Sequence, residues 1–176
     1  MLLAACLIGV LPAEATCVRP SGFPYSVDLI YSEPLSSMDT TCWTYSGNAS
    51  FINSGSCYPA AKFTGGGDGT VDQDTVANGP GDYYSAMFYI DIYDTHHSWQ
   101  DEIDIYVLDA SNNQLLASMG SYSGASSPVS CSQQSVNFGY QPSWHGKTLR
   151  VEIYAYEGYS DARFIVSGVH LWASTG

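Results

Sequence analysis

The stretch that decides the fold reads Tyr83-Tyr84-Ser85-Ala86-Met87-Phe88-Tyr89-Ile90-Asp91-Ile92-Tyr93. From Ala86 onward, every second residue is an apolar residue of core type, and the residues between them are Met, Tyr or Asp. Successive side chains of a strand point to opposite faces, so this alternation predicts a strand with one face on a core and the other in water. One-sided strands of this kind are typical of antiparallel sheets.

Two later stretches repeat the alternation. The apolar rows are Ile103, Ile105 and Val107, then Leu149, Val151, Ile153 and Ala155. The interleaved rows are Glu102, Asp104 and Tyr106, then Arg150, Glu152, Tyr154 and Tyr156. The chain is therefore predicted to be all-β, with a solvent-exposed sheet face that is rich in tyrosines and carboxylates.

Turn-forming residues separate ten strand-like runs, and no helical period of useful length occurs. We predict strands at residues 27–31, 42–46, 60–64, 70–76, 83–94, 102–109, 114–120, 129–137, 148–157 and 163–172. This number of strands favours a two-sheet antiparallel jelly-roll β-sandwich, with an immunoglobulin-type sandwich as the alternative.

Length and charge limit the classes of function. A sandwich of 176 residues fits a single domain. Five Lys and Arg against 17 Asp and Glu give a formal net charge of -12. Such a surface repels phosphate backbones, so nucleic acid and anionic membranes are excluded as expected partners.

Residues 1–15 have features of an export signal, with a short apolar run followed by Ala13 and Ala15 as small residues before a cleavage point. The run is too short to span a bilayer, so we expect no membrane insertion. No Lys or Arg precedes it, and a lipobox ending at Cys6 is an alternative. We predict cleavage after Ala15, a single β-sandwich domain at residues 16–176, and a secreted, extracellular protein.

Four cysteines would then remain: Cys17, Cys42, Cys57 and Cys131. An even number in an exported chain predicts two disulfides, for which the sequence allows three pairings. We favour Cys42 with Cys57, because they flank a hairpin-like stretch whose closure is worth about 3 kcal/mol. Cys17 would then pair with Cys131. A metal site is disfavoured, since there is no Cys-x-x-Cys and no His at ligand spacing from a Cys.

Residues 42–50, 60–66 and 69–76 resemble the opening strands of galactose-binding-like jelly rolls, and Trp144 and the closing strand at 164–171 continue the likeness. The resemblance covers roughly residues 38–173 and rests on strand order. It implies a secreted module that binds carbohydrate or glycan. The last strand lacks the Asp often found there, at Val166-Ser167-Gly168-Val169, so a calcium site that relies on that carboxylate is not carried over.

The run from Asp101 to Tyr106 approaches the Glu-x-Asp-x-Glu strand of laminarinase-type glycoside hydrolases, which are also jelly rolls. A retaining glycosidase needs a nucleophile and an acid/base that are both carboxyl groups. Tyr106 stands where the acid/base should be, and Glu102 and Asp104 fit outward strand residues. We therefore expect no catalytic residue and no enzyme activity.

No cofactor is expected, although Asp68, Asp72 and Asp74 leave calcium open as an alternative to a solvated strand edge. His96 and His97 are adjacent, so their side chains diverge and make a poor chelate. No metal ligand is assigned.

We predict a glycan-binding surface, because Tyr and Trp offer flat faces for sugar rings and carboxylates accept hydrogen bonds from hydroxyl groups. Its residues are Tyr89, Asp91, Tyr93, Trp99, Asp104, Tyr106, Tyr154 and Tyr156. The competing interpretation is that tyrosines serve as ordinary strand residues, with Tyr93 and Tyr106 as a cross-strand pair. A different class also remains open. A retained segment at residues 1–11 would suit a self-assembling filament subunit that adds a strand to its neighbour.

Overall fold

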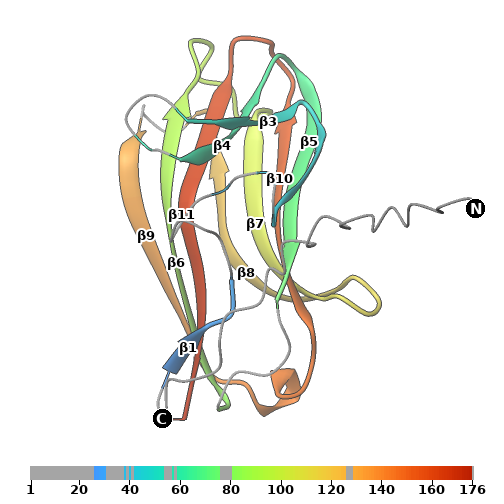
Figure 1. Ribbon diagram of the computed structural model, residues 1–176. Coiled ribbons are helices and arrows are strands. Elements are labelled where there is room, and N and C mark those ends of the chain that lie inside the picture. Colours follow the sequence, from blue (N-terminus) through green and yellow to red (C-terminus); the bar gives the residue numbers. More distant parts are fainter. Residues whose placement is uncertain are drawn as a thin grey trace, which may run out of the picture.

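The protein is a sandwich of two antiparallel sheets (Figure 1). The structure is a computed structural model that describes residues 26–30, 38, 40, 42–53, 57, 59–75, 81–125 and 129–175. The six-stranded sheet has the order β3-β4-β11-β6-β9, with β1 also paired to β11, and the five-stranded sheet has the order β2-β5-β10-β7-β8. This arrangement confirms the predicted all-β, two-sheet architecture.

The strands are β1 (Ser26–Asp28), β2 (Thr44–Gly47), β3 (Ala49–Ile52), β4 (Ala60–Thr64), β5 (Gly67–Asp74), β6 (Tyr83–Tyr93), β7 (Glu102–Asp109), β8 (Gln114–Ser123), β9 (Val129–Tyr140), β10 (Leu149–Glu157) and β11 (Arg163–Ser174). A single 3-10 turn, η1 (Pro142–Trp144), lies between β9 and β10 in the described part of the chain. The sequence predicted each strand except β3. Four residues are too few to show a period, and the turn before them hid the strand.

The turn at Gly47 and Asn48 takes the chain from the five-stranded sheet to the six-stranded sheet. Gly47 ends β2 with a φ of 64°, and a Cβ there would lie 2.0 Å from the carbonyl oxygen of Asp68. Only glycine combines this left-handed conformation with so close a backbone approach. The following Asn48 donates its N–H to the same carbonyl, after which β3 joins the six-stranded sheet.

The core lies between the two sheets and confirms the predicted apolar rows. Their exposed fractions are all 2% or less, and the members are Ala86, Phe88, Ile90, Ile92, Ile103, Ile105, Val107, Leu149, Val151, Ile153 and Ala155. On β11 the inward residues are Phe164 and Val166, then Val169 and Leu171. A bulge between Ser167 and His170 shifts the alternation by one residue and keeps both halves of β11 facing the core.

The strand order separates β6 from β7. They follow each other in the chain but belong to different sheets, so the predicted cross-strand pair of Tyr93 with Tyr106 is wrong. Tyr93 instead lies opposite Arg163 on β11, whose guanidinium group is 5.2 Å from the centre of the Tyr93 ring. The alternation of each strand is a local signal, whereas the sheet it joins is decided by contacts far away in the sequence.

The disulfide joins Cys57 to Cys131, so the expected pairing of Cys42 with Cys57 is wrong. Cys57 precedes β4 and Cys131 lies on β9, and two strands separate β4 from β9 in the sheet. Cys57 itself packs with Ile165 of β11 and Tyr89 of β6, the two strands that lie between β4 and β9. Cys42 is also disulfide-bonded, and its partner lies outside the described residues.

Because Cys131 is bonded to Cys57, the expected pairing of Cys17 with Cys131 is wrong as well. The expected cleavage of residues 1–15 concerns residues outside the described part. Within the described part, no helix has the length and apolar character needed to cross a membrane.

We expect the double variant Cys57→Ala/Cys131→Ala to lose about 4 kcal/mol in the free energy of unfolding, because the bond closes a loop of 74 residues. Urea denaturation measures this loss. Ser130→Ala, at the exposed neighbour of Cys131, is the matched control and should unfold as wild type does. A loss below about 1 kcal/mol in the double variant would contradict a role for the bond in holding this segment.

Candidate functional site

The outer face of the five-stranded sheet carries a grid of polar and aromatic side chains on three neighbouring strands. Its first row is Asp68 of β5, Tyr156 of β10 and Glu102 of β7. The second row is Thr70, Tyr154 and Asp104, and the third row is Asp72, Glu152 and Tyr106. We call these nine residues the outer grid. They are the residues that alternate with the core rows, and the pairing of strands brings them together.

Three tyrosines provide the apolar surfaces of the outer grid. Tyr154 and Tyr156 are two residues apart on β10, which separates them by about 7 Å. Tyr106 lies on the neighbouring strand, one position diagonal to Tyr154. Tyr156 is 46% exposed, and Tyr106 and Tyr154 are half-buried, so ring surface is open to solvent.

Carboxylates hold the hydroxyl groups of two of these rings. Burial, and next a hydrogen bond from its hydroxyl to Asp104, raise the pKa of Tyr106 to about 12. Burial also raises the pKa of Tyr154, followed by the charge of Asp68 and a hydrogen bond to it. Both tyrosines therefore stay protonated and donate to carboxylates, which fixes the orientation of their rings.

Arg150 closes one end of the outer grid. Its Nε and one terminal nitrogen donate to the two oxygens of Asp74 at 2.6 and 3.2 Å, and Nε lies 3.7 Å from Asp72. Burial raises the pKa of Asp72, partly offset by the guanidinium charge. Of the three aspartates that left calcium open, Asp74 is thus paired with Arg150, Asp72 lies beside the same guanidinium group, and Asp68 stands apart at the other end of β5.

Hydroxyl side chains border the outer grid on both sides. On β8 they are Ser118, Ser121 and Ser123, and on β2 they are Thr44 and Ser46. Ser121 donates to Glu102 at 2.6 Å. The face as a whole is therefore rich in acceptors and hydroxyl groups, and Arg150 is the one cationic side chain that the structure describes on it.

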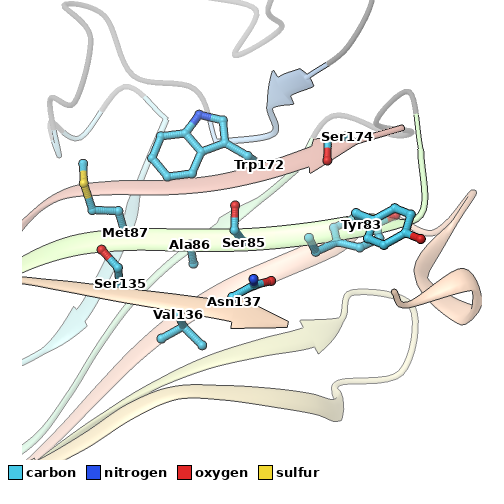
Figure 2. A pocket seen from close by; sticks show the side chains of 10 residues that line it. Tyr83, Ser85, Ala86, Met87, Ser135, Val136, Asn137, Trp172 and Ser174 are labelled. Atoms are coloured by element: carbon cyan, nitrogen blue, oxygen red, sulfur yellow. The ribbon is translucent and has the colours of Figure 1, made fainter. Parts of the chain in front are cut away.

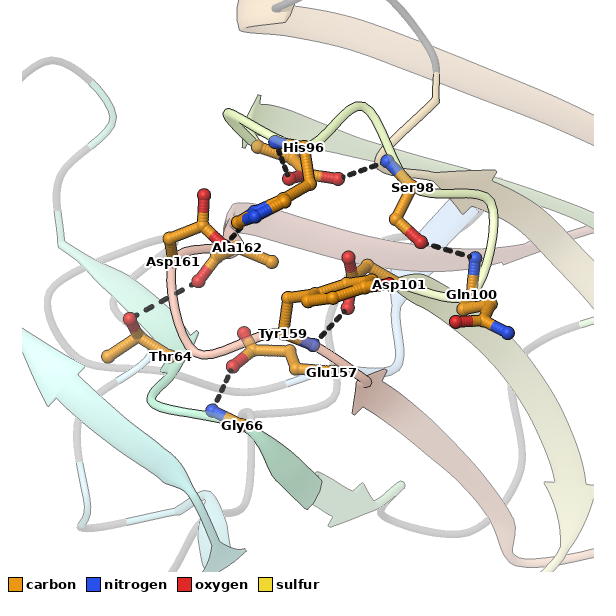
Figure 3. A network of polar contacts seen from close by, with 11 residues as sticks. Thr64, Gly66, His96, Ser98, Gln100, Asp101, Glu157, Tyr159, Asp161 and Ala162 are labelled. Atoms are coloured by element: carbon orange, nitrogen blue, oxygen red, sulfur yellow. Dashed lines mark hydrogen bonds and ion pairs between the residues drawn. The ribbon is translucent and has the colours of Figure 1, made fainter.

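Glu157 anchors the end of β10 next to Tyr156 (Figure 3). Its Oε2 accepts the N–H of Gly66 at 3.0 Å and the side-chain amide of Asn48 at 3.3 Å, which ties the turn before β5 to β10. The side chain is fully buried, and its Oε1 has no donor among the described residues. Burial accordingly raises the pKa of Glu157 to about 7, although the N–H of Gly66 opposes the shift.

The residues predicted as one binding surface lie in three places. Asp104, Tyr106, Tyr154 and Tyr156 belong to the outer grid, whereas Tyr89, Asp91 and Tyr93 lie on β6 in the other sheet. Trp99 is 77% exposed in the loop between β6 and β7. A single surface containing all eight residues is therefore wrong.

Asp91 is also a poor hydroxyl acceptor. It is only 7% exposed and lies 3.8 Å from Arg163. Sequence reasoning placed Arg150 and Glu152 in an outward row but did not select them, and it did not select Asp68 or Thr70 as ligand contacts. Selecting them would have required the register of β5 against β10, which the sequence does not show.

A second aromatic surface lies on the outer face of the six-stranded sheet. Figure 2 shows Met87, Ser85 and Trp172 on one side of the sheet, with Ala86 and Val136 on the other. Together with Tyr83 and Asn137 they line a shallow groove of about 540 Å³. This groove contains no described carboxylate, so its chemistry differs from that of the outer grid.

No family model matches the sequence, and no curated protein matches it. Among solved structures, the chain is similar to the xylan-binding module CBM15, with 12% identity and a TM-score of 0.52 over 88% of this chain and 100% of that one. It is also similar to the CBM22-1 xylan-binding domain of Xyn10C from Paenibacillus barcinonensis, with 12% identity and a TM-score of 0.51 over 88% and 99%.

A third similar structure contains the CBM22-1 and GH10 modules of xylanase 10B from Clostridium thermocellum, with 10% identity and a TM-score of 0.52 over 88% of this chain and 29% of that one. At such identities the likeness concerns the fold. The protein has the antiparallel jelly-roll β-sandwich of carbohydrate-binding modules, as the resemblance in its sequence implied.

Glu157 makes the stability of the protein depend on pH. Its pKa rises from an ordinary 4.5 to about 7 in the folded state, so the folded protein holds this proton more tightly than the unfolded chain does. In a metal-free buffer with EDTA, the stabilisation that comes from the protonated Glu157 is fully present below pH 4.5 and is lost as the pH rises to about 7.

The variant Glu157→Gln should therefore lack this decline. At pH 8 its free energy of unfolding should be about 1 to 3 kcal/mol higher than that of wild type. Urea denaturation at pH 5 and pH 8 measures the difference. Glu102→Gln, at an exposed glutamate on β7, should keep the decline. Equal slopes for wild type and Glu157→Gln would show that this carboxyl group is not the cause.

Proposed function

We propose that this protein is a non-catalytic carbohydrate-binding module of an extracellular protein, and that it binds its ligand on the outer grid. The observation that carries the proposal is the set of three tyrosines that alternate with carboxylates on one sheet face. The grid spans four residue steps along β10, or about 13 Å, which is longer than a single pyranose ring. A short oligosaccharide fits this surface better than a monosaccharide.

The side chains of the outer grid match the chemistry of a sugar. Pyranose rings present C–H groups that pack on the flat faces of tyrosine, and their hydroxyl groups donate hydrogen bonds. An ionised carboxylate only accepts hydrogen bonds, so Glu102, Asp104 and Glu152 are suited to ligands with many hydroxyl donors. The same negative charges repel uronic acids and sulfated sugars, since Arg150 is the one described cation on this face that opposes them. We therefore infer that the ligand is a neutral glycan.

The comparisons support a carbohydrate ligand through the shared fold. Two of the similar structures are named as xylan-binding, and a third belongs to a xylanase. From these structures we infer only that the ligand of this chain is a carbohydrate, and we do not infer that it is xylan. The paired cysteines support an oxidising, extracellular location.

Glycan binding should depend on the outer grid and not on the opposite sheet. We expect Tyr154→Ala and Tyr106→Ala each to lower the affinity for a neutral glycan by about 1 to 3 kcal/mol, as loss of an aromatic anchor does. The ligand is found on an array of xylan, β-glucan, mannan and galactan fragments, and calorimetry on the best hit gives the affinities.

Tyr93→Ala and Trp99→Ala are the matched aromatic controls, because one lies on the other sheet and the other in a loop. They should bind as wild type does. If they abolish binding while Tyr154→Ala does not, the site lies on β6 and its loop instead. If no neutral glycan binds, the proposed function is wrong.

Hydrolysis of β-glucan and xylan should be undetectable. Glu102 and Asp104 lie on one face of β7. The next residue on that face is Tyr106, at the position where glycoside cleavage would need a carboxyl group as proton donor. Reducing-sugar release over long incubations measures this. Turnover that disappears in Glu102→Gln would show that the strand is an active site.

A further inference from the structure

The free edge of β9 lacks the features that usually protect an edge strand from pairing with another chain. Strand edges present backbone N–H and C=O groups, and proteins shield them with short strands, bulges, prolines or charged side chains. β9 is twelve residues long and lies at one side of the sandwich (Figure 1). β6 pairs with one of its edges, and no described strand pairs with the other.

The other edge strands of the described structure are each protected. β1 has three residues, and β2 and β3 have four each. β8 has ten, but its register against β7 shifts twice, which divides its paired residues into 114–115, 117–118 and 120–123. Such bulges interrupt the row of backbone groups that a partner strand would need. These four edges are therefore too short or too irregular to take up another strand.

The middle of β9 is regular over a longer distance. Residues 132–137 pair without interruption with residues 85–90 of β6. The register shifts lie at the two ends of this run, where Cys131 and Gly139 have φ values of 46° and 67°. In an antiparallel ladder, every second residue directs its N–H and C=O away from the partner strand. The run therefore offers an unbroken row of backbone groups on its free edge.

The same side of the protein carries no charged side chain. From Ala110 to Gly146 the sequence contains no Asp, Glu, Lys or Arg, although the chain has 5 Lys and Arg and 17 Asp and Glu. Residues 85–90, which pair with the middle of β9, are uncharged as well. The groove in Figure 2 continues this neutral surface from Ser135 of β9 to Trp172 of β11.

The simplest alternative is that water alone covers this edge. Serine, asparagine and glutamine are ordinary surface residues, and water can pair with the free backbone groups. This alternative gives no reason why the longest regular edge is also the one without a charged residue. It also leaves Tyr83 and Tyr140 unexplained. Their rings are 5.3 Å apart at the end of β9, and the residues are 43% and 59% exposed.

Charge indicates which partner fits the edge. Two copies with a net charge of -12 repel each other where their acidic surfaces meet, and contact through a neutral side keeps those surfaces apart. A basic partner would instead be drawn to the carboxylates of the outer grid. A two-fold axis through the middle of β9 lays residues 132–137 antiparallel to the same residues of a second copy. The two rows of backbone groups are then identical and complementary.

We propose that this protein forms a two-fold dimer in which residues 132–137 of β9 pair with the same residues of a second copy. The two six-stranded sheets then form one continuous sheet. Exposed hydroxyl and amide side chains beside the edge, at Gln133, Ser135 and Asn137, can hydrogen-bond across the interface. The outer grid lies on the other sheet and stays open. The inference therefore does not rest on glycan binding.

Sedimentation equilibrium of the full chain over a wide range of concentrations tests the dimer. One strand edge makes a small interface, so we expect a weak and reversible equilibrium of monomer and dimer. Added NaCl should strengthen the dimer, because salt screens the repulsion between the two acidic copies. A dimer that NaCl weakens would be held by ionic contacts, which overturns the proposal.

The variant Ser135→Lys should raise the dissociation constant of the dimer at least about fivefold, because the two-fold axis brings two lysines close together. The same substitution makes the net charge less negative, so general repulsion cannot explain a weaker dimer. Ser118→Lys, at an exposed position on β8, is the matched control and should dimerise as wild type does. If circular dichroism shows that Ser135→Lys is unfolded, Asn137→Lys replaces it.

Hydrogen exchange locates the interface. At concentrations that populate the dimer, the amides of β9 should exchange more slowly than in dilute protein, and those of β8 should not change. Added protection in β8 or in the outer grid, without protection in β9, overturns the proposal. A chain that stays monomeric at every concentration overturns the second copy as the partner and indicates that water covers the edge.

Discussion

The packing of two apolar sheet faces against each other is the constraint on which the rest of the structure depends. Because both sheets bury one face, every core residue on a strand sends its neighbour to the outer surface. Ile153 and Ala155, both fully buried, thereby place Tyr154 and Tyr156 in water. The aromatic positions of the outer grid are in this sense set by the core beneath them, and a slip of one residue in β10 would exchange the two sets.

β11 shows how strictly this constraint is kept. Gly168 adopts a φ of 54°, and a Cβ there would lie 3.0 Å from the ring of Tyr89. The bulge around it adds one residue, so that Val166 and Val169 both point to the core although they are three positions apart. Irregular backbone appears here because a regular strand of this sequence would turn half of its apolar residues outward.

This constraint also explains how far the sequence could predict the molecule. The alternation along a strand is local, so the core rows and the outward rows of β6, β7 and β10 were predicted correctly. Sheet membership is not local, and β6 and β7 have the same alternation although they belong to different sheets. Tyr93 and Tyr106 therefore seemed to share a face in the sequence and are separated in the structure. The predicted partner of Cys57 was wrong for the same reason, since its actual partner lies on β9, which two strands separate from β4 in the sheet.

Two kinds of force hold the outer grid and the loops beside it. On the sheet, register positions the three tyrosines, and carboxylates also hold two of them, Tyr106 through Asp104 and Tyr154 through Asp68. At the loop end, no ladder of backbone hydrogen bonds between described strands joins the two sheets, because each of these ladders lies within one sheet. Asp101, which precedes β7, is fully buried there, and burial, with a smaller contribution from Asp94 after β6, raises the pKa of its carboxyl group. Asp101 also accepts the N–H of Tyr159 at 3.0 Å, so this buried carboxyl group holds the loop that continues from Tyr156 of the outer grid.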